Sequence, residues 1–238
     1  MFEKDGPSLW ELAVQALSST ERGYDLLAPK FDHTPFRTPD PILQRAAAEI
    51  GPPLSIDRAL DVCCGTGAAL RALRPLCRKS IEGVDMSRGM LAEAKRRLAD
   101  APGEAEVVLE LGDALDLPFR ERFDVATCFG AFGHIEEHDE GRFVRSVYRS
   151  LKPGGRFVFV TADPPPLTSP GYWMAKGFNA TMRVRNWLIS PPFIMYYLTF
   201  LLPEARRRLE QNGFEVEVRE GLFDPPFGRL ALVIGTKA

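Results

Sequence analysis

Five short apolar runs, separated by helix-like segments, constrain the fold of this chain more than any other feature. The runs are RALDVCC, SIEGVD, EVVLELGD, FDVATCFG and RFVFVTA, all between residues 57 and 163. Each is nearly continuous in apolar residues, as in strands that are covered on both faces. Strands that alternate with helices form a parallel sheet with helices on each side. The sequence therefore predicts a three-layer α/β core.

The end of the chain has a different pattern. A helix is expected from Pro203 to Asn212, followed by Gly213, the residue type that most often occupies the position after a helix. The runs FEVEVREG and GRLALVIGTKA follow with no helix between them, so we expect an antiparallel hairpin. The predicted fold is therefore a Rossmann-like α/β sheet of seven mostly parallel strands with a C-terminal antiparallel hairpin.

Helices are also expected before the sheet. Ser8 and Glu11 form a capping-box pattern, and a second helix is expected from Thr38-Pro39 to Ile50. The segment between them, YDLLAPKFDHTPFR, has the composition of a turn-rich connector. We expect one domain with four parts: an N-terminal helical cap at 1–55, the ligand-binding core at 56–163, an insertion at 164–203, and a C-terminal helix and hairpin at 204–238.

Composition excludes several classes of protein. The charge sum, 30 minus 32, is −2, so no overall positive field exists to hold a nucleic acid, and no nucleic-acid partner is expected. The four cysteines lack C-x-x-C spacing, which predicts free thiols in a cytoplasmic protein and no cysteine metal site. Charged residues near the N-terminus disfavour a signal peptide, and the most apolar stretch is too short and broken to span a bilayer.

A glycine turn and an acid twenty residues later indicate a nucleoside ligand. Gly65 and Gly67 lie where the first apolar run meets a helix, so the backbone there can approach a ligand closely. Asp85 ends the second run, where an acid can accept hydrogen bonds from a ribose diol. Alone, each feature fits an ordinary turn or a surface acid; together they predict nucleoside binding.

Two further positions distinguish between nucleosides. The third glycine of the dinucleotide fingerprint is replaced by Leu70, which disfavours NAD. Asp61, just before the turn, suits a ligand with an ammonium group rather than a phosphate. S-adenosylmethionine has an ammonium group and no phosphate.

The motifs in order make the resemblance clear. They are DVCCGTG, GVDMS, LGDALDLPF, FDVATCFGAFGHI and LKPGGRFVFV. The chain resembles class I S-adenosylmethionine-dependent methyltransferases, in the broad small-molecule group of methyltransferase types 11 and 25. The resemblance runs from about Tyr24 to Ala238, except for residues 164–202. It implies S-adenosylmethionine as cofactor and a small-molecule methyl acceptor as partner, and it leaves the acceptor and the oligomeric state open.

The resemblance also implies how the methionine end of the cofactor is held. Asp61 is expected to help hold it, with the Cys63 carbonyl and the backbone of Gly65 and Gly67 lining it. Phe129 is expected beside the sulfonium.

The adenosine end is expected to contact a second group of residues. Asp85 is expected to take the ribose hydroxyls and Met86 to pack on the adenine. Asp113 is expected to accept a hydrogen bond from the adenine amino group, beside the Ala114 backbone.

The chain is partly similar to quinone-ring C-methyltransferases. Cys63 in place of the usual glycine, and the run Tyr24-Asp25-Leu26-Leu27, match their pattern, and Tyr24 and Phe31 match aromatic positions that cover the methionine end. The match then fails, because their next asparagine is Ala28 and their E-x-S reads Thr161-Ala162-Asp163. Their downstream histidine and tryptophan are absent as well, so the resemblance does not assign that reaction.

His134 is the candidate catalytic base, if the acceptor must lose a proton. It follows the fourth run, at the sheet edge where ligands bind, and its ordinary pKa suits proton transfer. The alternative is that it packs against the next helix or shapes the pocket. His33 could also reach the pocket, whereas His138 lies among acids and is expected in solvent. HIEEH does not have the order of a zinc motif, so no metal is expected.

Residues 164–203, called the lid segment below, have an unusual composition. They hold seven of the twenty prolines, eight aromatic residues and three cations, with no acid. This composition fits a cover over an aromatic or lipophilic acceptor, with Trp173, Phe178, Trp187 and Tyr196 facing it. It also fits weak contact with a membrane surface, or ordinary packing on the sheet.

Three functions remain open from the sequence. The first is an active methyltransferase for a small, aromatic or lipophilic acceptor, by in-line methyl transfer. A nucleotide-dependent oxidoreductase is disfavoured by Leu70 and by the terminal hairpin. A cofactor- or lipid-binding protein without activity is disfavoured because Asp61, Asp85 and Asp113 are all present.

Overall fold

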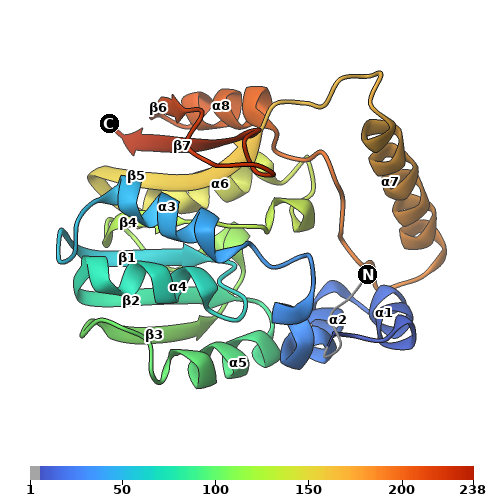
Figure 1. Cartoon of the computed structure of the whole chain (residues 1–238), viewed down its shortest axis with the longest axis horizontal. Coiled ribbons are helices and arrows are strands. Elements are labelled where there is room, and N and C mark those ends of the chain that lie inside the picture. The colour runs from blue at the N-terminus through green and yellow to red at the C-terminus, as the bar shows by residue number, and fades with distance from the viewer. Residues whose placement is uncertain (1–5) are drawn as a thin grey trace.

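A seven-stranded sheet forms the centre of the molecule (Figure 1), in a computed structural model that describes residues 6–238. Its strand order is β3-β2-β1-β4-β5-β7-β6. The bounds are β1 (Ile56–Val62), β2 (Cys77–Asp85), β3 (Glu106–Leu111), β4 (Phe123–Thr127), β5 (Leu151–Ala162), β6 (Phe214–Arg219) and β7 (Leu230–Lys237). Strands β1 to β5 pair in parallel, and β7 pairs antiparallel with both β5 and β6. The predicted fold class is confirmed.

Both faces of this sheet are covered by α3 (Asp40–Ile50), α4 (Ala68–Leu73), α5 (Arg88–Leu98), α6 (Glu140–Ser150) and α8 (Leu202–Gln211). The helices α1 (Leu9–Ala16), α2 (Thr20–Leu27) and α7 (Pro170–Leu188) lie to the side of the sheet (Figure 1). One buried cluster joins the sheet to α6 and α8 through Phe143 and Leu209. The other joins it to α3, α4 and α5 through Ala46, Leu70 and Ala94. Each face therefore has its own core, as continuous apolar strands require.

The N-terminal connector differs from expectation. The connector expected over residues 24–37 is helical as far as His33 rather than turn-rich: the end of α2 is followed by the 3₁₀ helix η1 (Ala28–His33). The Ser19 hydroxyl caps α2 by accepting from the backbone N–H of Arg22. Gly23 lies inside α2, where a Cβ would be 2.7 Å from the ring of Phe193. The glycine is needed for close packing and not for a turn.

The segment Lys152-Pro153-Gly154-Gly155 also differs from expectation. The fifth strand was expected over RFVFVTA, but α6 ends at Ser150 and β5 already begins at Leu151, so these four residues belong to the strand. The pairing between β4 and β5 shifts register here, since Phe123 pairs with Leu151 and Val125 with Arg156. The extra residues form an irregularity within the strand, which the proline and the glycines permit.

The lid segment leaves the sheet after β5 and returns at α8. It contains α7, which stands beside α1 and α2 and apart from the sheet (Figure 1). Across residues 6–238, no helix combines the length and apolar character needed to cross a membrane.

Candidate functional site

The carboxyl ends of four parallel strands meet at one edge of the sheet. β3, β2, β1 and β4 are consecutive neighbours in the strand order. Asp61 is in β1, Asp85 ends β2, Asp113 follows β3 and Phe129 follows β4. Adjacent parallel strands point the same way, so these residues, distant in sequence, are brought to a common edge. In open α/β sheets this edge is where ligands bind.

The glycine loop after β1 has a backbone that leaves space for a ligand. Gly65 and Gly67 have φ of +52° and +84°, the left-handed region that glycine tolerates. A Cβ on Gly65 would meet nothing within 4 Å, whereas one on Gly67 would meet Leu98 at 3.0 Å. Gly65 therefore faces open space and Gly67 permits packing on α5. Cys63 also has a positive φ, +57°, at the position where the related pattern has glycine.

Asp85 ties this loop to the end of β2. Its carboxylate oxygens accept from the backbone N–H of Gly65 at 2.8 Å and of Ser87 at 2.9 Å. Burial raises the pKa of Asp85, and both hydrogen bonds oppose that rise. The carboxylate is therefore held in one orientation at the mouth of the loop.

Asp61 is a buried acid with one strong partner. Its carboxylate accepts from the Thr127 hydroxyl at 2.6 Å. Burial raises its pKa to about 7. Within residues 6–238 no lysine or arginine forms an ion pair with it. A cationic group beside Asp61 would stabilise its charged form.

Tyr24 and His134 form a hydrogen-bonded pair above this edge. The Tyr24 hydroxyl lies 2.7 Å from His134 Nε2, and His134 Nδ1 lies 2.6 Å from the carbonyl oxygen of Ile194. A carbonyl only accepts, so Nδ1 carries the proton and Nε2 accepts from Tyr24. Burial lowers the pKa of His134 and raises that of Tyr24. Both groups are therefore neutral at pH 7.

Aromatic rings surround Tyr24. The ring of Phe193 stacks on it at 6.4 Å and 7°, and that of Phe31 lies 6.1 Å away. The charge of Asp85 adds to burial in raising the pKa of the Tyr24 hydroxyl. Tyr24 and Phe31 thus lie together, with Tyr24 beside the glycine loop.

Two acids that sequence reasoning missed dock the N-terminal helices on this site. Asp25 accepts from the Ser87 hydroxyl at 2.6 Å and from the Gly89 backbone N–H at 2.8 Å. Asp32 accepts from the Thr66 hydroxyl at 2.6 Å and from Arg97 at 2.7 Å. Each acid directly follows an aromatic candidate, in Tyr24-Asp25 and Phe31-Asp32, and that repeated pair was the signal available in the sequence.

The side of the site near β3 is more open. Met86 is 47% exposed although it follows a buried strand. Asp113 is exposed, and its Oδ1 accepts from the backbone N–H of Leu115 at 2.9 Å. Ala114 begins the short helix η3 (Ala114–Asp116) and packs against the core. Met86 and Asp113 thus present one apolar and one acidic group at the same open end.

The other two histidines have different surroundings. His138 is exposed, with Glu136 and Asp139 oxygens at 3.5 and 3.4 Å, as expected for a histidine in solvent. His33 is the last residue of η1.

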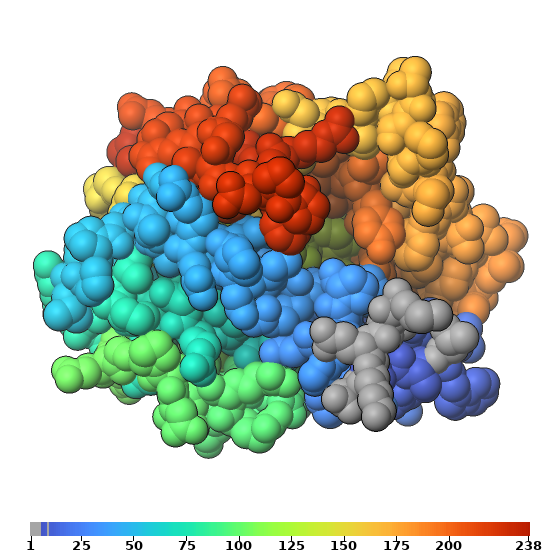
Figure 2. All heavy atoms as spheres, in the orientation of Figure 1, coloured from blue at the N-terminus to red at the C-terminus, as the bar shows by residue number. Residues whose placement is uncertain are grey.

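The cover over the site differs from expectation. Trp173 and Trp187 are 63% and 83% exposed, so they do not face the site. The segment after α7 covers it instead: the Tyr196 N–H donates to the Gly133 carbonyl at 2.8 Å, and Ile194 holds His134. Figure 2 shows a depression between this orange segment, the blue N-terminal segment and the red loop before β7.

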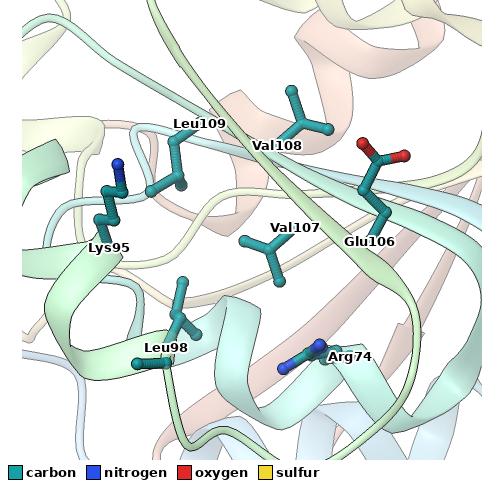
Figure 3. Close-up of a pocket in the computed structure, with 8 residues that line it drawn as sticks. Arg74, Lys95, Leu98, Glu106, Val107, Val108 and Leu109 are labelled. Atoms are coloured by element: carbon teal, nitrogen blue, oxygen red, sulfur yellow. The ribbon is translucent and has the colours of Figure 1, made fainter.

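A separate surface cleft of about 500 Å³ lies between α5 and β3. Figure 3 shows Lys95 and Leu98 on one side and Val107 and Glu106 on the other. None of the candidate residues lines this cleft, which borders the edge strand of the sheet.

Comparisons with known proteins show the family of this chain. A family model described as a methyltransferase domain matches residues 59–155. Demethylmenaquinone methyltransferase of Symbiobacterium thermophilum is 40% identical over 112 residues, 46% of this chain and 44% of that protein. The corresponding Staphylococcus aureus protein is 33% identical over 175 residues, 68% of this chain and 70% of that protein.

The alignments with relatives and with solved structures cover different shares of the chains. The chain spans about half the length of several of the relatives it matches. Among solved structures, the DhpI–SAH complex has a TM-score of 0.66 at 19% identity, covering 93% of this chain and 97% of that one. The fold is thus shared over nearly the whole chain.

Proposed function

Since the chain belongs to the class I S-adenosylmethionine-dependent methyltransferase family, we propose that it transfers a methyl group from S-adenosylmethionine to a small, aromatic or lipophilic acceptor. The observation that carries the proposal is the buried Asp61 carboxylate, which has no cationic partner within residues 6–238, beside a glycine loop with open space above Gly65. The residues present fit this cofactor, because its ammonium group would compensate Asp61 and its uncharged ribose needs no phosphate cradle.

We assign one group of residues to the methionine end of the cofactor and a second group to its adenosine end. Asp61, the Cys63 carbonyl and the backbone of Gly65 and Gly67 hold the methionine end, with Phe129 beside the sulfonium. Tyr24 and Phe31 cover that end. At the other end Asp85 accepts hydrogen bonds from the ribose hydroxyls and Met86 packs on the adenine. Asp113 accepts a hydrogen bond from the adenine amino group, beside the Ala114 backbone.

When bound, the cofactor supplies a methyl group already activated by a sulfonium charge. The work of the protein is then mainly to hold the acceptor in line, and positioning can supply about 7–11 kcal/mol. A base is needed only for an acceptor that must lose a proton.

We propose that His134 takes that proton through Tyr24. An acceptor hydroxyl would donate to the Tyr24 oxygen while the Tyr24 proton passes to His134 Nε2 at 2.7 Å. The resulting imidazolium would keep its second N–H on the Ile194 carbonyl. Neither residue need ionise by itself, which fits the raised pKa of Tyr24 and the lowered pKa of His134.

The acceptor class follows from two observations. The relatives above are demethylmenaquinone methyltransferases, and their name gives a quinone as the acceptor. The cover contributes Phe193 and Tyr196, with no acid in the whole lid segment. We propose a lipophilic aromatic acceptor, such as a phenol or quinol, that enters by the depression in Figure 2. The free cysteines favour a reducing compartment, so we place the activity in the cytoplasm.

Ligand binding tests the cofactor assignment. By calorimetry we expect adenosylhomocysteine and adenosylmethionine to bind at micromolar or lower concentrations and NAD not to bind. Binding of NAD without adenosylhomocysteine would favour the oxidoreductase alternative. Cofactor binding with no transfer to any phenol, quinol or amine in a broad screen would favour a binding protein without activity.

Cofactor affinity should depend on pH through Asp61. The ammonium group is attracted to Asp61 only when this acid is ionised, so affinity should be full above its pKa and fall below it. With a pKa of about 7 in the free protein, the association constant should fall about thirtyfold from pH 8 to pH 5.5. Asp61→Asn should bind more weakly at pH 8 and lose most of this dependence. An unchanged pH profile in that variant would contradict the role of Asp61.

A further inference from the structure

Three polar residues of helix α7, Asn179, Arg185 and Asn186, bond to neighbouring segments of the chain. Asn179 donates to the Tyr197 carbonyl at 2.7 Å and accepts from the Tyr197 N–H at 2.8 Å. Asn186 bonds the Phe193 backbone in the same way, at 3.1 and 2.9 Å. Arg185 donates to the carbonyls of Ala16 and Ser18, both at 2.9 Å. These bonds fix the rotation of α7 about its own axis.

The opposite side of α7 is apolar and faces solvent. Successive residues of a helix are about 100° apart around its axis, so the exposed large apolar side chains of α7 fall within an arc of about 140°. This outer stripe consists of Trp173, Met174, Val184, Trp187 and Leu188, all exposed. An amphipathic helix ordinarily turns such a stripe toward the core. Here the stripe lies on the surface, which is typical of a surface that binds a partner.

Two cations border the stripe on one side. Lys176 Nζ lies 5.6 Å from the Tyr172 ring centre, and Arg183 Cζ lies 5.8 Å from that of Tyr196. Arg185 is used internally, and residues 164–203 contain no acid. The stripe and its border thus combine tryptophan, aliphatic groups and positive charge without opposing negative charge on the same segment.

We propose that the outer stripe of α7 docks on an anionic lipid bilayer, with the helix lying in the interface. Tryptophan favours the interface of a bilayer, and basic residues beside an apolar face favour anionic headgroups. A second copy of this chain would bring the same cationic border, with no acid in residues 164–203, to both sides of the interface, so an anionic membrane fits the charge better.

Docking at this face would also deliver a lipophilic acceptor. The chain that follows α7 carries Phe193, Ile194 and Tyr196, which contact Tyr24, His134 and Gly133. Only this delivery step rests on the proposed function; the docking can be tested without any acceptor.

The test is sedimentation of the full chain with vesicles. We expect binding to vesicles of equal parts phosphatidylcholine and phosphatidylglycerol, and weaker binding to phosphatidylcholine alone. Trp173→Ala with Trp187→Ala should lower the partition coefficient at least about tenfold, because each indole loses buried apolar area. Lys176→Gln and Arg183→Gln should each lower it about fivefold on anionic vesicles only, and less at high salt.

Two matched variants complete the test. Leu54→Ala removes an exposed apolar side chain near the start of β1, at the opposite end of the strands, and should not change vesicle binding. Trp10→Phe leaves Trp173 and Trp187 as the tryptophans, whose emission should shift to the blue and be quenched by brominated lipid. Unchanged melting temperature and adenosylhomocysteine binding in the variants would show that they fold.

Three results would overturn the proposal. They are no sedimentation of the wild type with either vesicle, equal binding by the tryptophan variants, or a dimer in solution that those variants dissociate while vesicles bind nothing. Adenosylhomocysteine binding, measured on the same samples, would fail only if the proposed function fails.

Discussion

Tyr24→Phe is expected to lower kcat about hundredfold or more while leaving the adenosylhomocysteine dissociation constant within about twofold, since general base catalysis contributes about 10²–10⁴. The substitution keeps the ring that stacks on Phe193 but removes the hydroxyl between the acceptor and His134. His134→Asn should cause a similar loss. Single-turnover kinetics with an acceptor found by screening would measure both.

The pH profile separates this pair from Asp61. The pair works while His134 is neutral, so kcat should fall only as the pH drops below the lowered pKa of His134, which lies under its ordinary value of 6.5. The fall caused by Asp61 lies near pH 7 and should affect cofactor affinity instead. Tyr196→Phe is the matched control, because that hydroxyl accepts from Asn186 at 3.2 Å rather than bonding to His134. If Tyr24→Phe transfers methyl groups at the wild-type rate, His134 only positions the cover.

Asp85→Ala is expected to weaken adenosylhomocysteine binding by about 1.5–3 kcal/mol, or roughly ten- to more than a hundredfold. The change removes the expected acceptor for the ribose hydroxyls. It also releases the Gly65 N–H, which Asp85 holds at 2.8 Å, so the glycine loop loses its fixed geometry. Calorimetry at pH 8 would give the dissociation constant.

Two variants help to interpret that result. Asp85→Asn keeps one acceptor oxygen and should lose less affinity. Asp113→Ala should lose less still, because Asp113 is exposed and its Oδ1 already caps η3. The melting temperature of each variant would separate loss of the fold from loss of the ligand. A dissociation constant unchanged in Asp85→Ala would mean that this acid holds only the protein backbone.

The sheet and the main motif positions could be predicted from the sequence because their determinants are local. Apolar runs such as FDVATCFG form buried strands, and adjacent parallel strands end at one edge, so Asp61 and Asp85 had to approach each other. Local sequence patterns did not predict the role of residues whose packing depends on residues distant in sequence. Gly23 lies inside α2 because a side chain there would collide with the ring of Phe193, and Cys63 takes a backbone angle usual for glycine.

The sequence by itself determined the α/β core, the class of cofactor site and the unusual composition of the lid segment. Only the tertiary structure decided that Tyr24 pairs with His134, 110 residues away, and that Asp25 and Asp32 dock the N-terminal helices. The tertiary structure also decided the rotation of α7 about its own axis, because Arg185 donates a hydrogen bond to the Ala16 carbonyl, 169 residues away in sequence. Helical periodicity determines which residues share a face of the helix. Which face is exposed depends on the positions of backbone carbonyls, distant in sequence, that accept hydrogen bonds from the polar side chains of the helix. The tryptophans of α7 therefore face solvent, although composition favoured the acceptor pocket.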